Sequence, residues 1–125
     1  MYDIMILVSG GTGFVGRALV RHLISDGKEV RLLLRPSQTP HLPPGVALDV
    51  TVCSLTDERG LRAAMRNVET IYHLIGAERL GLKADLNKVD VEVTQMLVNA
   101  ALQTGVSRFI YLSHLGADRS SAYPV

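Results

Sequence analysis

Glycines recur closely near the start of the chain, in residues 8–16, which read VSGGTGFVG. Gly11, Gly13 and Gly16 fit the pattern GxGxxG, and a count that starts at Gly10 also fits GxxGxxG. Without side chains at these positions, the backbone can approach a pyrophosphate and the following helix can pack tightly on its sheet. The phosphate would bind to unpaired N–H groups at the positive end of that helix. The spacing therefore predicts a phosphate-binding turn, with a glycine-rich hairpin or a helix start without a ligand as the alternative.

The elements around this turn alternate between strands and helices. Short runs rich in Val, Ile and Leu predict parallel strands covered on both faces, at residues 4–8, 29–34, 47–53, 70–75 and 108–113. Apolar residues at helical spacing predict helices at residues 14–26, after a capping Thr56, and from Leu86 to a stop at Gly105. The alternation predicts an α/β fold, a Rossmann-type doubly wound parallel sheet of about five strands in the order 3-2-1-4-5. A ligand crevice then lies at the carboxyl ends of the first and fourth strands.

The composition limits the classes of partner. The 125 residues are enough for one domain, and 47% of them are hydrophobic, 20% are charged and the net charge is +1. This balance does not favour nucleic acid or a membrane as a partner, and no apolar run approaches the roughly 20 residues that span a bilayer. The single cysteine, Cys53, allows no internal disulfide, which favours a cytoplasmic location. His22, His41 and His73 share no metal-ligand spacing with Cys53, so no metal site is expected.

The residue that ends the second predicted strand bears on the choice of cofactor. In dinucleotide-binding folds this position meets the 2′ position of the adenosine ribose, and an acid there favours NAD. The sequence has Arg35 here and Ser37 two residues later. Because a guanidinium suits a 2′-phosphate, we expect NADP(H) to be preferred over NAD(H). An exposed arginine that only solvates the end of a strand is the alternative.

Five features together resemble one protein family. They are the glycine turn, Arg35, SLTD at residues 54–57, YHLIGA at residues 72–77 and RFIYLSHLGA at residues 108–117. Together they are similar to the amino-terminal half of an extended or atypical short-chain dehydrogenase/reductase, in the NAD-dependent epimerase/dehydratase and NmrA-like group. The resemblance covers essentially all 125 residues. Its motifs are specific to the superfamily and do not indicate a substrate.

The resemblance implies a set of cofactor contacts. The glycine turn would hold the pyrophosphate, and a short segment after the fourth strand would line the path toward the nicotinamide ribose. Ser54 and Leu55, after the third strand, would border the adenine, although both also fit an ordinary loop. The full set expected to bind NADP, or NAD as the second choice, is Gly10, Gly11, Thr12, Gly13, Phe14, Val15, Gly16, Arg35, Ser37, Ser54, Leu55, Leu74, Ile75 and Gly76.

Three positions depart from the pattern of that family. Where members often have GDLTD, this chain has CSLTD, so Ser54 replaces the carboxylate that contacts adenine and recognition there is expected to be looser. Where many members have NxxGT, residues 90–94 read DVEVT. At the end of the fifth strand, His114 follows Ser113 where many catalytic members have Ser or Thr. His114 either donates a hydrogen bond to a substrate carbonyl or packs at the strand end.

The catalytic pair of the family is YxxxK, in which a tyrosine phenol transfers the proton and a lysine lowers the phenol's pKa. Tyr123 is the tyrosine after the fifth strand, and its lysine would lie beyond Val125. In a longer parent we expect Tyr123 to act as acid and base, with Ser113 or His114 polarising the substrate oxygen. Without the lysine a phenol, whose ordinary pKa is about 10, is a poor base at neutral pH. We therefore expect residues 1–125 alone to be inactive.

The expected domain is a single NAD(P)-binding unit over residues 1–125, with the substrate-binding region outside the sequence. The expected function is that of the cofactor half of a reductase or epimerase that exchanges hydride with a carbonyl or alcohol carbon. One alternative is a non-catalytic binding module, as in NmrA-like redox sensors and an accessory subunit of respiratory complex I. Another is an interaction fragment that binds no nucleotide. The exposed edge of the fifth strand also favours self-association.

Overall fold

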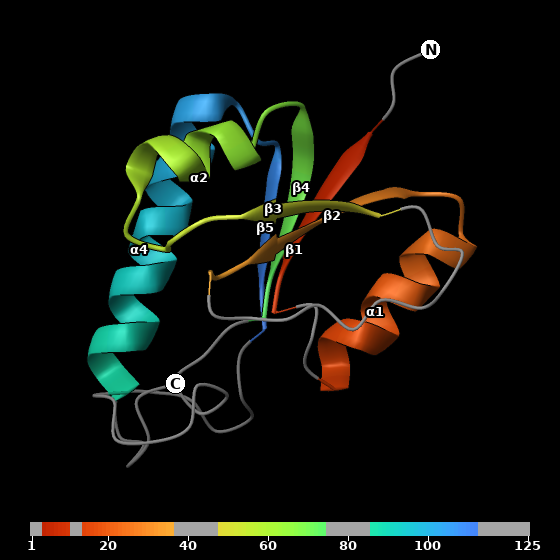
Figure 1. Cartoon of the computed structure of the whole chain (residues 1–125), viewed down its shortest axis with the longest axis horizontal. Helices are drawn as coiled ribbons and strands as arrows, with labels where there is room; N and C mark the ends of the chain where they lie inside the picture. Colours follow the sequence, from red (N-terminus) through yellow and green to blue (C-terminus); the bar gives the residue numbers. More distant parts are fainter. Residues whose placement is uncertain (1–3, 11–13, 37–47, 75–85, 113–125) are drawn as a thin grey trace.

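Five parallel strands form the sheet in the computed structural model, which describes residues 4–10, 14–36, 48–74 and 86–112. They lie side by side in the order β3-β2-β1-β4-β5 (Figure 1), which confirms the predicted order. Every neighbouring pair of strands is parallel. The strands are β1 (Met5–Ser9), β2 (Glu29–Leu34), β3 (Asp49–Val52), β4 (Val68–His73) and β5 (Arg108–Tyr111).

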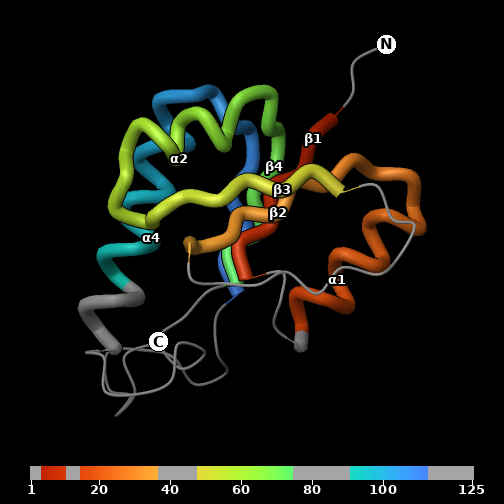
Figure 2. The backbone as a smooth tube through the Cα atoms, viewed as in Figure 1, coloured from red at the N-terminus to blue at the C-terminus, as the bar shows by residue number. Residues whose placement is uncertain are grey.

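The helices of the described residues cover the sheet on both faces. One side carries α1 (Phe14–Ser25), and the other carries α2 (Glu58–Ala64) and α4 (Leu86–Thr104) (Figure 1). Figure 2 follows the backbone from β3 through α2 into β4, and from α4 into β5. Because each helix separates two parallel strands in the chain, the sheet is doubly wound, as the alternation of elements predicts.

Side chains alternate between the two faces of each strand, so the sheet has two cores. Leu7 and Val8 are consecutive and fully buried, yet they belong to different cores. The core under α2 and α4 includes Leu7, Leu33, Leu61, Ala64, Met65, Ile71 and Leu97. The core under α1 includes Ile6, Val8, Val20, Leu23, Val30, Leu32, Leu34 and Leu74. Burial of each large apolar side chain contributes about 1.5–3 kcal/mol, which explains the continuous apolar runs in the central strands.

Two helices end at glycines, as predicted. Gly27 has a φ of +80°, and the N–H of Lys28 donates to the carbonyl of Leu23 at 3.0 Å. This left-handed turn satisfies carbonyl groups that the end of α1 leaves without helical partners. Gly105 also has a φ of +80° and follows the last turn of α4.

The start of α2 differs from the prediction, which gave the cap to Thr56. The cap is Asp57, whose extended backbone (φ −93°, ψ 96°) lets its carboxylate accept the N–H of Gly60 at 3.1 Å. The Thr56 hydroxyl instead lies 3.0 Å from the hydroxyl of Ser54. The helix therefore begins one residue later than a Thr56 cap requires.

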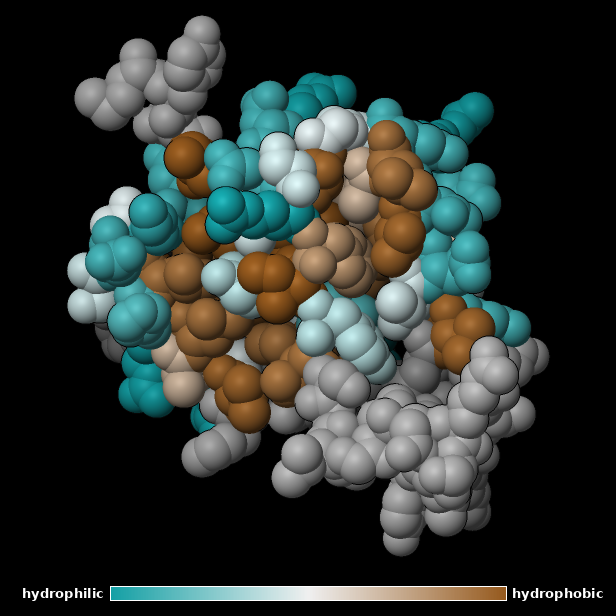
Figure 3. All heavy atoms as spheres, turned by 180° about the vertical axis from the view of Figure 1, so that it is seen from behind, coloured by the Kyte–Doolittle hydropathy of each residue, from teal (hydrophilic) through white to brown (hydrophobic). Residues whose placement is uncertain are grey.

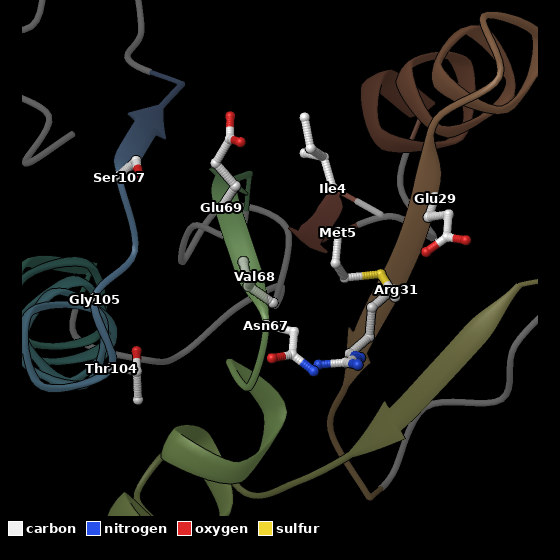
Figure 4. A pocket seen from close by; sticks show the side chains of 10 residues that line it. All are labelled: Ile4, Met5, Glu29, Arg31, Asn67, Val68, Glu69, Thr104, Gly105 and Ser107. Carbon is white, nitrogen blue, oxygen red and sulfur yellow. The ribbon is translucent and has the colours of Figure 1, made fainter. Parts of the chain in front are cut away.

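Arg31 of β2 connects three elements near the amino-terminal end of the sheet. Its Nε donates to Oδ2 of Asp49 on β3 at 2.7 Å. Its Nη1 donates to the carbonyls of Ala64 at 2.6 Å and Arg66 at 2.9 Å, at the negative end of α2. Figure 4 shows Arg31 in a polar groove of about 690 Å³ that Glu29 also lines. This groove lies at the edge opposite the glycine turn.

Candidate functional site

The glycine turn connects β1 directly to α1. Strand β1 ends at Ser9, Gly10 follows with a φ of +86°, and α1 begins at Phe14. Only glycine adopts such a φ without steric cost, so the start of the predicted turn depends on Gly10. Gly16, in the first turn of α1, is buried, as expected where a helix packs closely on its sheet.

The first turn of α1 presents a positive end toward this edge. It carries no acidic side chain that would neutralise the partial charge of the helix dipole. Val15, in the same turn, is 38% exposed. The backbone of Gly10 and the start of α1 therefore fit an anionic ligand, because a left-handed glycine precedes a helix start, where the first N–H groups have no acceptor within the helix. The predicted contacts Gly11, Thr12 and Gly13 lie outside the described residues.

The ends of β1 and β4 form the floor beside the turn. Ser9 pairs with His73 in the register of these strands, and the N–H of Leu74 donates to the carbonyl of Ser9 at 2.9 Å. Leu74, predicted to line the cofactor path, is buried. The neighbouring predicted contacts Ile75 and Gly76 lie outside the described residues. These two strand ends lie where the strand order reverses, which is the place expected for a ligand crevice.

A buried hydrogen-bond chain lies at this floor, and the sequence did not single it out as a site. Oγ of Ser9 is 2.8 Å from Nδ1 of His73, and Nε2 of His73 is 3.0 Å from Oγ1 of Thr94 on α4. Ser9 and His73 are both fully buried. Burial lowers the pKa of His73 from 6.5 to about 4, so the ring is neutral at neutral pH. Ser9 and His73 fall in segments that carried the family resemblance, whereas Thr94 falls in a segment that departs from the family pattern.

Arg35 lies at the carboxyl edge, as predicted. It directly follows the last residue of β2, and β2 pairs with β1 along its length. Its side chain is half-buried. Ser37, the other residue expected near the 2′ position of the ribose, lies outside the described residues. The position of Arg35 at the end of β2 therefore agrees with the prediction, and its contact with a cofactor stays a prediction.

The predicted adenine contacts lie after β3. Ser54 is exposed, and its Oγ accepts the N–H of Thr56 at 3.3 Å. Leu55 is buried and lines an apolar groove of about 510 Å³ between this loop and α4, with Val91, Val93 and Met96. An apolar groove next to exposed hydroxyl groups can hold the face of an aromatic base.

Cys53, at the start of this loop, has a packing role. It is buried, its thiol donates to the carbonyl of Ser54 at 3.1 Å, and burial together with the nearby Asp57 carboxylate raises its pKa. A methyl group on Gly60 would stand 2.7 Å from Sγ of Cys53. The thiol is therefore a packing group held under the first turn of α2 and is a poor nucleophile.

The predicted catalytic residues Ser113, His114 and Tyr123 lie outside the described residues. The described part of β5 ends at Tyr111, and the N–H of Leu112 donates to the carbonyl of His73 at 3.2 Å. The chain therefore enters the predicted catalytic segment from the edge that carries the glycine turn. Among the described residues, no group of three or more His, Cys, Asp or Glu side chains could hold a metal ion. Within the same residues, no helix has the length and apolar character needed to cross a membrane.

Sequence comparison places this arrangement among known proteins. A family model described as NAD(P)H-binding matches residues 10–125. The chain is 35% identical over 113 residues to sterol demethylase protein B of Methylococcus capsulatus, covering 89% of this chain and 34% of that protein. It is 32% identical over 124 residues to the mitochondrial NADH dehydrogenase (ubiquinone) 1 alpha subcomplex subunit 9 of Rattus norvegicus, covering 95% of this chain and 33% of that protein. The chain thus spans about a third of the length of these relatives.

Solved structures give the same result. The crystal structure of gox2253 superposes with a TM-score of 0.78 and 33% identity, covering 96% of this chain and 38% of the other. A short-chain dehydrogenase/reductase superfamily protein from Agrobacterium tumefaciens with bound NAD superposes with a TM-score of 0.65 and 34% identity. That match covers 86% of this chain and 31% of the other. Both comparisons confirm the family resemblance drawn from the sequence motifs.

Proposed function

We propose that this chain, which belongs to the NAD(P)H-binding family and has relatives of the short-chain dehydrogenase/reductase and epimerase type, binds a nicotinamide dinucleotide. We further propose that it binds NADP(H) in preference to NAD(H). The observation that carries cofactor binding is the left-handed Gly10 between β1 and the positive end of α1. The observation that favours NADP(H) is Arg35 at the end of β2, because a guanidinium binds a phosphate with two parallel hydrogen bonds.

Calorimetric titration of the protein with NADPH and with NADH tests this proposal. We expect both to bind, with NADPH at least tenfold tighter. Binding of neither dinucleotide would contradict the proposed function. Equal or tighter binding of NADH would contradict the role of Arg35 and leave cofactor binding intact.

The proposed activity of the whole protein is that of an oxidoreductase or epimerase/dehydratase. The bound cofactor would supply a hydride acceptor or donor at nicotinamide C4. Tyr123 would exchange the proton, and Ser113 or His114 would hold the substrate oxygen by a hydrogen bond. Residues 1–125 would form its NAD(P)-binding domain, and the protein would act in the cytoplasm. The substrate would mainly contact a region that corresponds to the part of the relatives outside this match. In the whole protein, Tyr123→Phe should abolish substrate turnover, whereas NADPH should still bind.

A non-catalytic module is the second candidate function. Two observations favour it: His114 stands where many catalytic relatives have Ser or Thr, and subunit 9 of NADH dehydrogenase is among the relatives. Such a protein would bind NADPH with similar affinity but would not oxidise or reduce it. Detectable turnover of NADPH with any carbonyl substrate would exclude this candidate.

We also propose that the chain self-associates through the exposed edge of β5. The outer edge of this strand has no described neighbour, and Ile110 within the strand and Leu112 directly after it are 39% and 45% exposed. Figure 3 shows apolar side chains gathered over much of the face seen from behind. A second copy would cover this surface and pair with the edge strand. Sedimentation of the protein at tens of micromolar should give a dimer or larger species, and a monomer would contradict the proposal.

A further inference from the structure

The chain of hydrogen bonds from Ser9 to Thr94 joins three elements at the carboxyl edge. Ser9 is the last residue of β1, His73 is the last residue of β4, and Thr94 lies in α4. The two hydrogen-bond distances along the chain are 2.8 Å and 3.0 Å. No local sequence pattern connects these positions, because the bonded residues are 64 and 21 positions apart. The contact exists only because the strand register and the packing of α4 bring them together.

The imidazole ring of His73 is held in one orientation. Its centroid lies 6.0 Å from that of Phe109 and 5.3 Å from that of Tyr111, both on β5. The ring is fully buried, so these neighbours and the two hydroxyl groups fix its plane. A fixed ring makes the positions of Ser9 and Thr94 depend on each other, because each hydroxyl must meet one ring nitrogen.

The protons available on Ser9, His73 and Thr94 indicate which atom donates in each of the two hydrogen bonds. A neutral imidazole carries one proton and accepts at its other nitrogen. The Ser9 hydroxyl is fully buried, and Nδ1 of His73 is the partner recorded for it among the described residues. The distances fit either direction, and the direction in which Ser9 donates to Nδ1 gives its buried hydroxyl proton an acceptor. In that direction Nε2 of His73 holds the ring proton and donates to Oγ1 of Thr94.

We propose that the Ser9–His73–Thr94 chain is a positioning device that sets the geometry of the glycine turn for the cofactor, with His73 as its Nε2–H tautomer. The inference rests on the proposed function, since it assigns the support of the same site. Ser9 immediately precedes Gly10, and Leu74 immediately follows His73. A movement of α4 would shift Thr94, and through the imidazole of His73 it would also shift Ser9 and the adjoining Gly10 and Leu74. Affinity for the dinucleotide therefore depends on the hydroxyl group of Thr94, although this residue lies on α4 and outside the glycine turn.

The test compares variants of Thr94 that separate its hydroxyl from its methyl group. Thr94→Val keeps the shape and removes the hydrogen bond, whereas Thr94→Ser keeps the hydroxyl and removes a methyl group. Thr104→Val is the matched control, because it also removes a hydroxyl from α4. The Thr104 hydroxyl donates to the carbonyl of Ala100 at 2.8 Å, within the same helix, and has no part in the Ser9–His73–Thr94 chain. Ser9→Ala interrupts the chain at its other end. Each variant is titrated with NADPH and with NADH at a temperature where thermal unfolding shows it to be fully folded.

The proposal predicts a specific order of affinities. Thr94→Val and Ser9→Ala should each weaken binding of the tighter dinucleotide about five- to twentyfold, while Thr94→Ser and Thr104→Val stay within about twofold of the unmodified protein. The double variant Ser9→Ala with Thr94→Val should lose less than the product of the two single effects, because the chain is already interrupted. Unchanged affinity in Thr94→Val and Ser9→Ala would overturn the inference but leave the proposed function standing. Failure of the unmodified protein to bind either dinucleotide would overturn both.

Nitrogen-15 NMR of the histidine side chains gives a readout that a packing role would not move. The unmodified protein should show His73 with a protonated Nε2 and an unprotonated Nδ1 at neutral pH. In Thr94→Val the ring proton loses its acceptor, so the population should move toward the Nδ1–H form, and Thr94→Ser should restore the original pattern. An Nδ1–H tautomer in the unmodified protein would overturn the proposed direction of the chain. An unchanged Nε2–H tautomer in Thr94→Val would overturn the role given to the Thr94 hydroxyl.

Discussion

Arg31 and Asp49 hold the two outermost strands on one side of the sheet together, with 2.7 Å between Nε and Oδ2. The same guanidinium reaches two carbonyls at the end of α2, so one side chain of β2 serves three acceptors, on β3 and at the end of α2. Its side chain is 14% exposed, which reduces the screening that weakens ion pairs at a surface. A planar guanidinium can meet these acceptors at once, whereas a lysine ammonium presents a single point charge.

Replacement of Arg31 by Lys should therefore destabilise the fold although the charge is kept. We expect a loss of about 1–2 kcal/mol in the free energy of unfolding, since the charge-assisted bonds of the guanidinium to its three acceptors are not all replaced. Urea unfolding measures this loss. Arg59→Lys, at an exposed position on α2, is the control and should stay within about 0.5 kcal/mol of the unmodified protein. Equal stability of the two variants would show that Arg31 acts only through its charge.

Gly10 and Gly27 offer a matched pair, because both have a left-handed φ but only Gly10 lies in the candidate site. Alanine at either position should lower the free energy of unfolding by about 1–2 kcal/mol. Apart from Gly27 and its chain neighbours, no atom of the described residues lies within 4 Å of a methyl group placed there, so its cost comes from the backbone. Gly10→Ala should in addition weaken dinucleotide binding at least tenfold, with the affinity of Gly27→Ala unchanged. Equal affinities in the two variants would place the pyrophosphate elsewhere.

Arg35→Ala should change which dinucleotide is preferred. Loss of bonds to a 2′-phosphate should weaken NADPH binding about ten- to a hundredfold, on the scale of charge-assisted hydrogen bonds. Affinity for NADH, which lacks that phosphate, should change by less than about twofold. Arg59→Ala controls for the general loss of positive charge. A parallel loss of affinity for both dinucleotides would assign Arg35 to the fold instead of to recognition of the 2′-phosphate.

The depressed pKa of His73 makes stability depend on pH. Its pKa is about 4 in the folded chain and about 6.5 when unfolded, so between these values the unfolded chain binds more protons. Stability should therefore fall as the pH drops from about 6.5 to 4, by about 3 kcal/mol from this residue. Denaturant unfolding at several pH values measures the slope. His73→Asn removes this titration but keeps the other three histidines, so its stability should vary less over the same range.

The sequence was sufficient to predict the elements that repeat a local pattern. Alternating apolar strands and amphipathic helices predicted the strand order, and Gly27 and Gly105 predicted where two helices end. The turn between β1 and α1 is likewise predicted from glycine spacing and strand-to-helix order, which are both local features, and its binding of phosphate stays a prediction.

Contacts between distant segments were not predictable in this way. The Ser9–His73 bond and the Arg31 cluster depend on which residues the strand register brings opposite each other. A cap at Thr56 is predicted because it places Asp57 and Glu58 in the first turn, where acids suit the helix dipole, and only the backbone conformation selects Asp57 as the cap. In each case the sequence gives the type of side chain that forms the hydrogen bond but not the residue with which it forms the bond.

Cys53 gives the molecule a built-in reporter of local opening. It is the single cysteine in the sequence, and it is buried under the first turn of α2 next to the proposed adenine contacts. A thiol reagent can reach it only when that turn separates from the sheet, so the rate of labelling measures how often this happens. A dinucleotide that occupies the neighbouring loop should slow the reaction. The native chain therefore lets ligand occupancy be followed as a chemical rate, without an added probe.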